Sequence, residues 1–532
     1  MGYRGGSSEV SDLDRWVARR SPAIQRRTSP WFWCGVLFFA TLPACTASDT
    51  DSATRQNVLT LGFSEGGTAN AERLGQLATI FTLEGLTQES VDARARPRLA
   101  RSWSWENNFL SLRLNLQPGV TFHDGTPFTS AVAAEALSRA IARPGNLALY
   151  PSFSDIRAVR PDGDLQLVLD LSQPSAFLPE DLEVPLSVGA QNAGTGPFRL
   201  ASTDSSGAVL QRFERYDLGA PHIEQIIIRP YTLRTAWTSL LRGDVDMVTD
   251  VPPQTVEFIR NDDIQVMSFA RRYQFLIAFN SQKPPFTSAA VRRALNASVN
   301  RDALITNVLQ GKGEAATGPL WPKHWAYDTS IQSFGFDPQV AMSLLDAVGL
   351  RPRTAPDTSS LPPARFHFTC LLPADFTLLE RIGLEVQKQL YDVGVDMQFE
   401  VVPFQEYDSR IREGRFEAVL VDMISGPTFE RPFIFWRSAR ESRYLNVFGY
   451  ENAEAERLFQ VLRRSTNEAA LRSAAYRLQR VLMEDPPALF LVWNERTRAV
   501  RRHFRIAGDS DRDPLRTIWQ WTENSEKRAA SR

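Results

Sequence analysis

Apolar and polar residues alternate with a period of two in several segments, which is the pattern of strands that bury one face. The clearest case is residues 112–117, where Leu112, Leu114 and Leu116 are separated by polar side chains. Other segments are apolar runs of strand length that end at turn residues. On these grounds we predict strands at residues 58–63, 112–117, 164–171, 223–230, 365–372, 395–401 and 488–493.

Apolar residues recur at helical spacing in four further segments, for which we predict amphipathic helices. Thr129 or Ser130 can cap the first of them, and Ser465 with Glu468 has the pattern of a capping box before the last. Helix, glycine and strand alternate in the second half of the chain, which favours a mainly parallel or mixed sheet there. The predicted helices cover residues 131–140, 288–299, 379–390 and 468–482.

Length and composition indicate a globular protein with several cores. The chain has 532 residues, and this length alone suggests three or four domains. Its contents of 43% apolar and 23% charged residues are ordinary for a globular protein. The formal net charge is -1, and no long basic run is present. Because nucleic-acid binding needs clustered Lys and Arg, we expect no nucleic-acid partner.

The N-terminus has the features of an export signal. Residues 1–30 are hydrophilic, and residues 31–44 form an apolar run that is shorter than the roughly 20 residues of a membrane-spanning helix. The run ends in Leu42-Pro-Ala-Cys45, which resembles a bacterial lipobox and implies lipid modification of Cys45 with loss of residues 1–44. A signal anchor, ordinary signal cleavage and a twin-arginine signal remain alternatives. Residues 45–56 are expected to form a flexible tether.

Catalytic motifs are absent from the sequence. It contains no HExxH, G-x-S-x-G, Walker or G-x-G-x-x-G pattern, and its five histidines are scattered. His123 beside Asp124 could be a base or a metal ligand, but a structural turn is the preferred interpretation. Cys370, the one cysteine in the body of the chain, is expected to be inert core. We therefore predict no catalytic residue, metal or cofactor.

Several motifs, taken in order, resemble those of the family 5 extracellular solute-binding proteins, the peptide- and nickel-binding receptors of ABC importers. The signature is GVTFHDGTPFT at residues 119–129, and GTGPF at residues 194–198 is similar to a turn of this family. No single motif decides the resemblance, whereas their order does. The segments that carry it are 82–87, 97–103, 119–129, 194–198, 241–247, 279–302 and 311–319.

The resemblance implies an α/β, two-lobed periplasmic-binding-protein-like fold of type II, the large cluster C, with mixed sheets and an extra subdomain in lobe one. Lobe one would be discontinuous, at residues 57–275 and 490–523, with the subdomain at about 96–191. Lobe two would span residues 276–489, and 524–532 would be a tail. The two crossings between the lobes, near residues 275–280 and 487–493, would act as the hinge.

The resemblance also suggests where a ligand binds, namely the loop after the first strand and residues 416–436. In peptide-binding members an acidic residue of the second region meets the peptide amine, but Gly426-Pro427 stands there in this chain. Simple dipeptide recognition is therefore in doubt. Aromatic and polar side chains suit a small-molecule site, although a plain turn, core packing or a solvated arginine would explain the same residues. The candidate ligand-binding residues are Glu65, Gly66, Asp422, Ser425, Phe429, Arg431 and Trp436.

The function implied by the resemblance is that of a substrate-binding lipoprotein, not an enzyme. It would capture a small solute or oligopeptide between its lobes and deliver it to ABC permease subunits. We expect a monomer, periplasmic or at the cell surface, held to the membrane by lipid at Cys45. The alternatives are a sensor or assembly lipoprotein on the same fold, and a hydrolase of a surface polymer.

Overall fold

The computed structural model describes ten stretches of the chain, all within the compact unit that begins at Gln56. None of the helices in these stretches is long and apolar enough to cross a membrane. The described stretches are residues 57–64, 70–143, 145–251, 262–332, 334–352, 364–374, 376–424, 429–438, 445–507 and 513–524.

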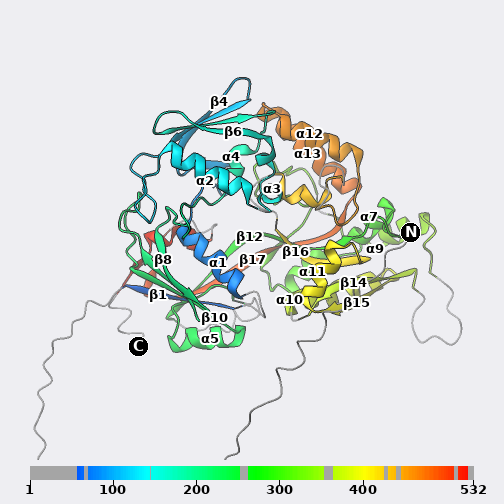
Figure 1. Ribbon diagram of the computed structural model, residues 1–532. Helices are drawn as coiled ribbons and strands as arrows, with labels where there is room; N and C mark the ends of the chain where they lie inside the picture. Colours follow the sequence, from blue (N-terminus) through cyan, green and yellow to red (C-terminus); the bar gives the residue numbers. More distant parts are fainter. Residues whose placement is uncertain are drawn as a thin grey trace, which may run out of the picture. The chain divides into compact units, whose positions relative to one another are not determined.

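Eleven strands form one long mixed sheet, with two long strands, β12 (Ile264–Phe279) and β17 (Ala488–Arg501), at its centre (Figure 1). The order is β15-β14-β16-β12-β17-β11-β1-β10-β9-β8, with β13 paired to β17. The chain therefore passes twice through the middle of the sheet. The other strands are β1 (Val58–Ser64), β8 (Phe198–Asp204), β9 (Gly207–Arg212), β10 (Gln225–Tyr231), β11 (Met247–Val248), β13 (Gly313–Ala315), β14 (Phe366–Pro373), β15 (Val395–Val402) and β16 (Ala418–Ile424).

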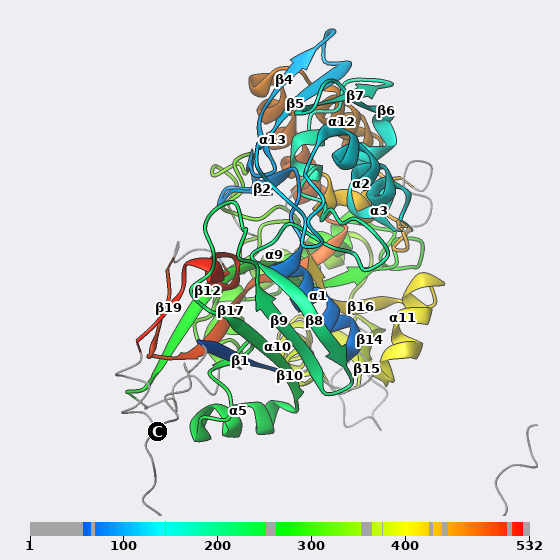
Figure 2. The same ribbon diagram turned by 60° about the vertical axis from the view of Figure 1, so that its left-hand side comes forward.

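Helices pack on both ends of this sheet and give each end its own core. At one end Leu59 and Leu61 of β1 pack with Phe81 of α1, and α5 covers the other face of the same strands (Figure 2). At the other end Ile382 and Leu390 of α10 pack with the strands β14 to β16. The helices are α1 (Asn70–Thr82), α5 (Leu233–Arg242), α7 (Ala289–Ala297), α8 (Arg301–Asn307), α9 (Pro338–Ala347), α10 (Thr377–Tyr391), α11 (Phe404–Arg412), α12 (Ala453–Arg464) and α13 (Glu468–Glu484).

A second, antiparallel sheet has the order β4-β5-β7-β6, and α2 packs against it (Figure 1). The predicted alternation is confirmed, because Leu112, Leu114 and Leu116 of β5 are fully buried in a core of their own. Thr129 caps α2 and accepts a hydrogen bond from the Val132 amide, as one of the two predicted caps. We call residues 95–190 around this sheet the subdomain. Its elements include β3 (Ala95–Pro97), β4 (Ala100–Glu106), β5 (Ser111–Leu116), α2 (Ser130–Ala142), α3 (Asn146–Leu149), the 3-10 helix η2 (Pro151–Asp155), β6 (Ile156–Pro161), β7 (Gln166–Leu171) and α4 (Leu178–Asp181). The short strand β2 (Thr87–Glu89) precedes the subdomain and pairs with β3.

The turn at residues 194–198 needs its glycines because it touches the backbone at the end of α1. A Cβ atom on Gly194 would lie 2.0 Å from the Thr82 carbonyl oxygen, and Gly196 donates its own amide to that oxygen. The His123 ring joins the same turn, with Nε2 2.9 Å from the Gly196 carbonyl oxygen. The interpretation of His123 as a structural residue is therefore confirmed.

We expect Gly194→Ala to lower the free energy of unfolding by about 1–3 kcal/mol, because the new methyl group must push two backbone segments apart. Denaturant unfolding followed by circular dichroism measures this change. Gly75→Ala is the control, since that glycine lies in α1 with open space around its Cβ position. It should be neutral or stabilising by up to about 1 kcal/mol. Equal effects of the two substitutions would contradict the close approach at Gly194.

One predicted helix cap is wrong. Ser465 is the C-cap of α12 and makes no capping box with Glu468. Asn467 caps α13 instead, since its side-chain oxygen accepts a hydrogen bond from the Ala470 amide at 3.1 Å. Asn is as good an N-cap as Ser, and here it lies directly before the first helical residue.

Candidate ligand-binding cleft

The parallel strands at both ends of the long sheet point their carboxyl ends at the middle of β12 and β17. β11 runs antiparallel to β17 and ends with Val248 beside Ala499. β16 runs antiparallel to β12 and ends with Ile424 beside Tyr273. Ligands of open α/β sheets bind outside the carboxyl ends of the strands. The register therefore places a candidate cleft over residues 270–274 of β12 and the adjoining part of β17.

The ladder between the two long strands is irregular at this point. Its register shifts between Ala270 and Gln274, and Gln274 lies opposite Trp493. The side-chain amide of Gln274 donates a hydrogen bond from Nε2 to the Gly318 carbonyl oxygen at 2.7 Å. Trp493 is 2% exposed, and its indole N–H has no acceptor among the described residues. A buried donor without a partner costs about 1–3 kcal/mol.

A half-buried ion pair borders the same stretch. Asp250, two residues after the end of β11, accepts a hydrogen bond from Arg496 of β17, and the side chains are 23% and 22% exposed. Val251 then donates its amide to the Thr497 carbonyl oxygen at 2.9 Å. These contacts bring a carboxylate and a guanidinium to the edge of the candidate cleft.

Three of the predicted ligand-binding residues, Glu65, Gly66 and Ser425, lie outside the described residues, as does the predicted lipidation site Cys45. Glu65 and Gly66 directly follow the end of β1, and Ser425 directly follows the end of β16. Strands β1 and β16 themselves end at the candidate cleft. Their ligand-binding roles stay predictions.

Phe429 and Trp436 belong to an aromatic core. Phe429 stacks on Phe177 of the subdomain with ring centroids 5.4 Å apart. Trp436 stacks on Phe448 at 5.0 Å, and its edge contacts Phe490 of β17. Both predicted residues are almost completely buried. Their roles in ligand binding stay predictions.

Arg431 and Asp422 differ in their surroundings. Arg431, in the 3-10 helix η3 (Arg431–Trp436), is buried; its Nε donates to the Leu149 carbonyl oxygen at 3.1 Å, and its guanidinium lies over the Tyr150 ring. Asp422 is an exposed residue of β16, in register with Phe275. Arg431 thereby connects η3 to the subdomain. Both residues remain predicted ligand contacts.

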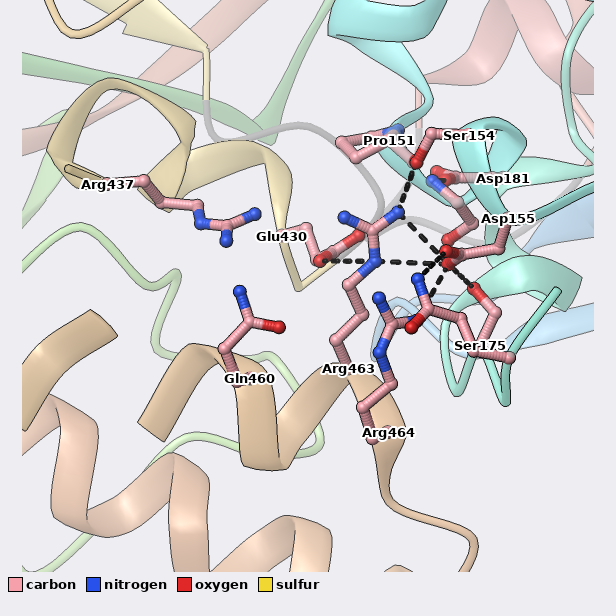
Figure 3. A network of polar contacts seen from close by, with 12 residues as sticks. Pro151, Ser154, Asp155, Ser175, Asp181, Glu430, Arg437, Gln460, Arg463 and Arg464 are labelled. Carbon is pink, nitrogen blue, oxygen red and sulfur yellow. Dashed lines mark hydrogen bonds and ion pairs between the residues drawn. The ribbon is translucent and has the colours of Figure 1, made fainter. Parts of the chain in front are cut away.

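Sequence reasoning missed a buried polar network between the subdomain and α12 (Figure 3). Arg463 donates to Asp155 Oδ2, to the Pro151 carbonyl oxygen at 2.7 Å and to Ser154 Oγ at 2.6 Å. Its Nε also lies 3.7 Å from Glu430. Asp155 and Arg463 are 308 positions apart in the chain. The network therefore joins two regions that the resemblance assigns to different lobes.

Two acidic groups of this network lie in surroundings that disfavour their charge. Burial, together with the nearby Glu430 carboxylate, raises the pKa of Asp181 well above its usual range. Burial also raises the pKa of Glu430, against the opposing effect of Arg463. At this interface burial therefore favours the neutral form of two carboxyl groups.

One sequence signal for the network existed. Arg463 follows Ala455, Phe459 and Leu462 on the buried face of α12, where a charged residue needs a partner. The sequence does not say which of its 61 acidic residues supplies that partner.

The described residues include no group of three or more His, Cys, Asp or Glu side chains that could hold a metal ion. Cys370 is fully buried in β14, and burial raises the pKa of its thiol. An inert thiol follows, as expected from the sequence.

Comparison with known proteins assigns the chain to a family. The profile of the bacterial extracellular solute-binding proteins, family 5 Middle, matches residues 94–444. The glutathione-binding protein GsiB of Pectobacterium atrosepticum is 27% identical over 61% of this chain and 66% of its own length. The oligopeptide-binding protein AppA of Bacillus subtilis is 22% identical over 77% of this chain and 80% of its own length.

Solved structures show the same fold. NikA from Brucella suis, in complex with Fe(III)-EDTA, superposes with a TM-score of 0.76 over 87% of this chain and 100% of that chain, at 19% identity. NikZ from Campylobacter jejuni, in complex with Ni(L-His), gives 0.73 over 88% and 100%, at 18% identity. The predicted two-lobed, mixed α/β fold is confirmed. The profile covers most of the chain, and the chain belongs to the family 5 extracellular solute-binding proteins.

Proposed function

We propose that this chain is the substrate-binding lipoprotein of an ABC importer. The observation that carries the proposal is the convergence of the strand ends, with Val248 of β11 and Ile424 of β16 both facing the middle of β12 and β17. A solute held there contacts both lobes at once. The solute therefore binds the closed arrangement more tightly than the open one, and this difference in binding free energy shifts the equilibrium toward the closed arrangement. No bond is broken in this capture and release.

The proposed ligand is a small polar solute, peptide-like or other. Relatives are named for binding glutathione and oligopeptides, and solved neighbours hold Ni(L-His) and a nonapeptide. The unpaired Trp493 N–H and the Asp250–Arg496 pair supply polar groups beside an aromatic core, which suits such a solute. The residues proposed to contact it from the adjoining loops and η3 are Glu65, Gly66, Asp422, Ser425, Phe429, Arg431 and Trp436.

Native mass spectrometry of the protein purified from its own host tests this proposal. We expect a small molecule that stays bound under native conditions and is released when the protein unfolds. The released compound should then raise the melting temperature of the emptied protein. Enzymatic conversion of that compound, or the absence of any bound or stabilising solute in a wide panel that includes peptides, would contradict the proposal.

We further propose that Cys45 is lipid-modified, which places a monomer at the periplasmic or outer face of a membrane. Cys45→Ser should abolish incorporation of labelled palmitate and release the protein from the membrane fraction. Cys34→Ser is the control, because it alters the apolar run without altering the lipobox, and it should keep the label. Equal labelling of Cys45→Ser and the unmodified chain would contradict this anchor.

A further inference from the structure

The subdomain and residues 429–438 and 445–464 form a buried interface. Phe177 stacks on Phe429, the Ala176 amide donates to the Arg463 carbonyl oxygen at 3.0 Å, and Arg463 reaches Asp155. Phe177 lies in the same apolar core as the residues of α12 and α13. A charged side chain and an aromatic ring are thus desolvated together where two distant parts of the chain meet.

Asp181 of α4 has no ion-pair partner among the described residues of this interface. It is 0% exposed, and Oδ2 accepts a hydrogen bond from the Ser152 amide at 2.8 Å. Oδ1 is buried and makes no hydrogen bond with the described residues, and the Ser152 hydroxyl is the neutral donor beside the carboxyl group. An isolated carboxylate in such a place costs several kcal/mol, and proteins avoid this cost by keeping the group neutral. A proton on Oδ1 also turns an acceptor that lacks a donor into a donor.

The surrounding cations Arg431 and Arg463 offset the charge of Asp181 only in part, because burial and Glu430 raise its pKa nonetheless. Arg463 lies 3.0 Å from Asp155 and 3.7 Å from Glu430, so its charge is engaged by these two carboxylates. Glu430 is 4% exposed, and its Oε2 also lacks a donor. Two further anionic groups lie around the site, Glu180 in α4 and Glu183 just after the end of α4. The remaining cationic groups are Arg431, Arg437 and Arg464.

Two of these cations are occupied elsewhere. Arg437 donates to Glu456 at 2.7 Å, and Arg464 lies 3.1 Å from Asp155. Arg431 donates a hydrogen bond to the Leu149 carbonyl oxygen, and its guanidinium lies over the Tyr150 ring. A proton is therefore the simplest way to remove the charge of Asp181 while the interface is formed.

We propose that docking of the subdomain on residues 429–438 and 445–464 takes up a proton at Asp181, so that closing of the protein is coupled to pH. The inference rests on the proposed function in one respect, since it takes this docking to be part of the closing step. When the two surfaces separate, Asp181 is exposed to water and loses its proton at any pH above the ordinary pKa of an aspartate.

The sign of the coupling follows from the two states. The docked state holds the proton and the separated state releases it, so falling pH favours docking and rising pH favours separation. The effect begins near the ordinary pKa of 3.8 and extends up to the raised pKa of the docked state. Within this window one proton changes the ratio of docked to separated molecules by up to about tenfold per pH unit.

Energy transfer between two dyes tests the proposal without any ligand. Cysteines introduced at exposed Arg157 of β6 and exposed Ala469 of α13 carry the dyes in the mature full-length protein, because native Cys370 is buried. We expect a larger high-transfer population at pH 5 than at pH 8. Asp181→Asn, which imitates the protonated side chain, should show the same population at both pH values.

Asp204→Asn is the matched control, since Asp204 is an exposed carboxylate at the β8–β9 turn, and it should keep the unmodified protein's response. Burial raises the pKa of Glu180 to about 7, so other groups titrate in this range and the difference made by Asp181→Asn is the deciding quantity. Populations that do not change with pH in the unmodified protein would overturn the proposal, even if Asp181→Asn did not fold.

An unchanged pH response in folded Asp181→Asn would overturn it as well. If the solute screens fail while transfer still depends on Asp181 and pH, the proposed transport function falls and the proton coupling of the interface stands. If a solute binds and energy transfer does not depend on pH, the proposed transport function stands and the proton coupling of the interface falls.

Discussion

Replacing Arg98 by methionine is expected to lower the free energy of unfolding by about 3–5 kcal/mol. Arg98 is buried and donates two hydrogen bonds to Glu84, at 2.6 and 2.8 Å, and two to Asp217, at 2.9 and 2.7 Å. Both carboxylates are themselves largely shielded from water. Without the guanidinium the two carboxylates lose their shared partner, and Glu84 keeps the Thr195 and Tyr216 hydroxyls as neutral donors. Denaturant unfolding at neutral pH measures the loss.

Arg96→Met is the control for this prediction, because Arg96 is an exposed residue of β3 only two positions away. It should change the free energy of unfolding by less than about 0.5 kcal/mol. A loss at Arg98 no larger than that at Arg96 would mean that the buried pairs contribute nothing measurable.

Replacing Arg463 by methionine is expected to weaken solute binding roughly a hundredfold or more, because the closed arrangement loses a buried pair worth about 3–5 kcal/mol when broken. The substitution removes the donor to Asp155, Ser154 and Pro151 and leaves the Asp155 carboxylate buried. Isothermal titration calorimetry with the solute identified from the host-purified protein measures this effect.

Arg457→Met serves as the comparison on the same helix, since Arg457 is exposed and pairs with Glu454. Its solute affinity should stay within about threefold of the unmodified protein. Should Arg463→Met bind as tightly as Arg457→Met, the interface between the subdomain and α12 would have no part in closing.

Much of the fold could be predicted because local patterns carry it. The alternation around Leu112 and Leu116 follows from one buried face of a strand, and tertiary packing in the subdomain core agrees with it. The turn at residues 194–198 was identified by its sequence. Its physical reason, the contact of Gly194 with the Thr82 backbone, needs the folded chain. The cap of α13 was assigned to the wrong residue because Ser465 and Asn467 are equally good caps.

The candidate site was less accessible to sequence reasoning. Loops that follow strands β1 and β16 could be identified, since ligand sites lie at strand ends and the resemblance points to the same loops. The convergence of these ends on Gln274 and Trp493 depends on strand register, which the sequence does not state. The network of Arg463, Asp155 and Asp181 joins residues about 300 positions apart, and no local pattern selects such partners.

Small-angle X-ray scattering of the lipid-free body, recorded with and without the identified solute, tests the central claim most directly. Two lobes that meet at β12 and β17 and close around a solute should give a smaller radius of gyration in the bound state. The Arg463→Met protein should compact less at the same solute concentration. A scattering profile that stays unchanged at saturating solute would contradict capture by closing.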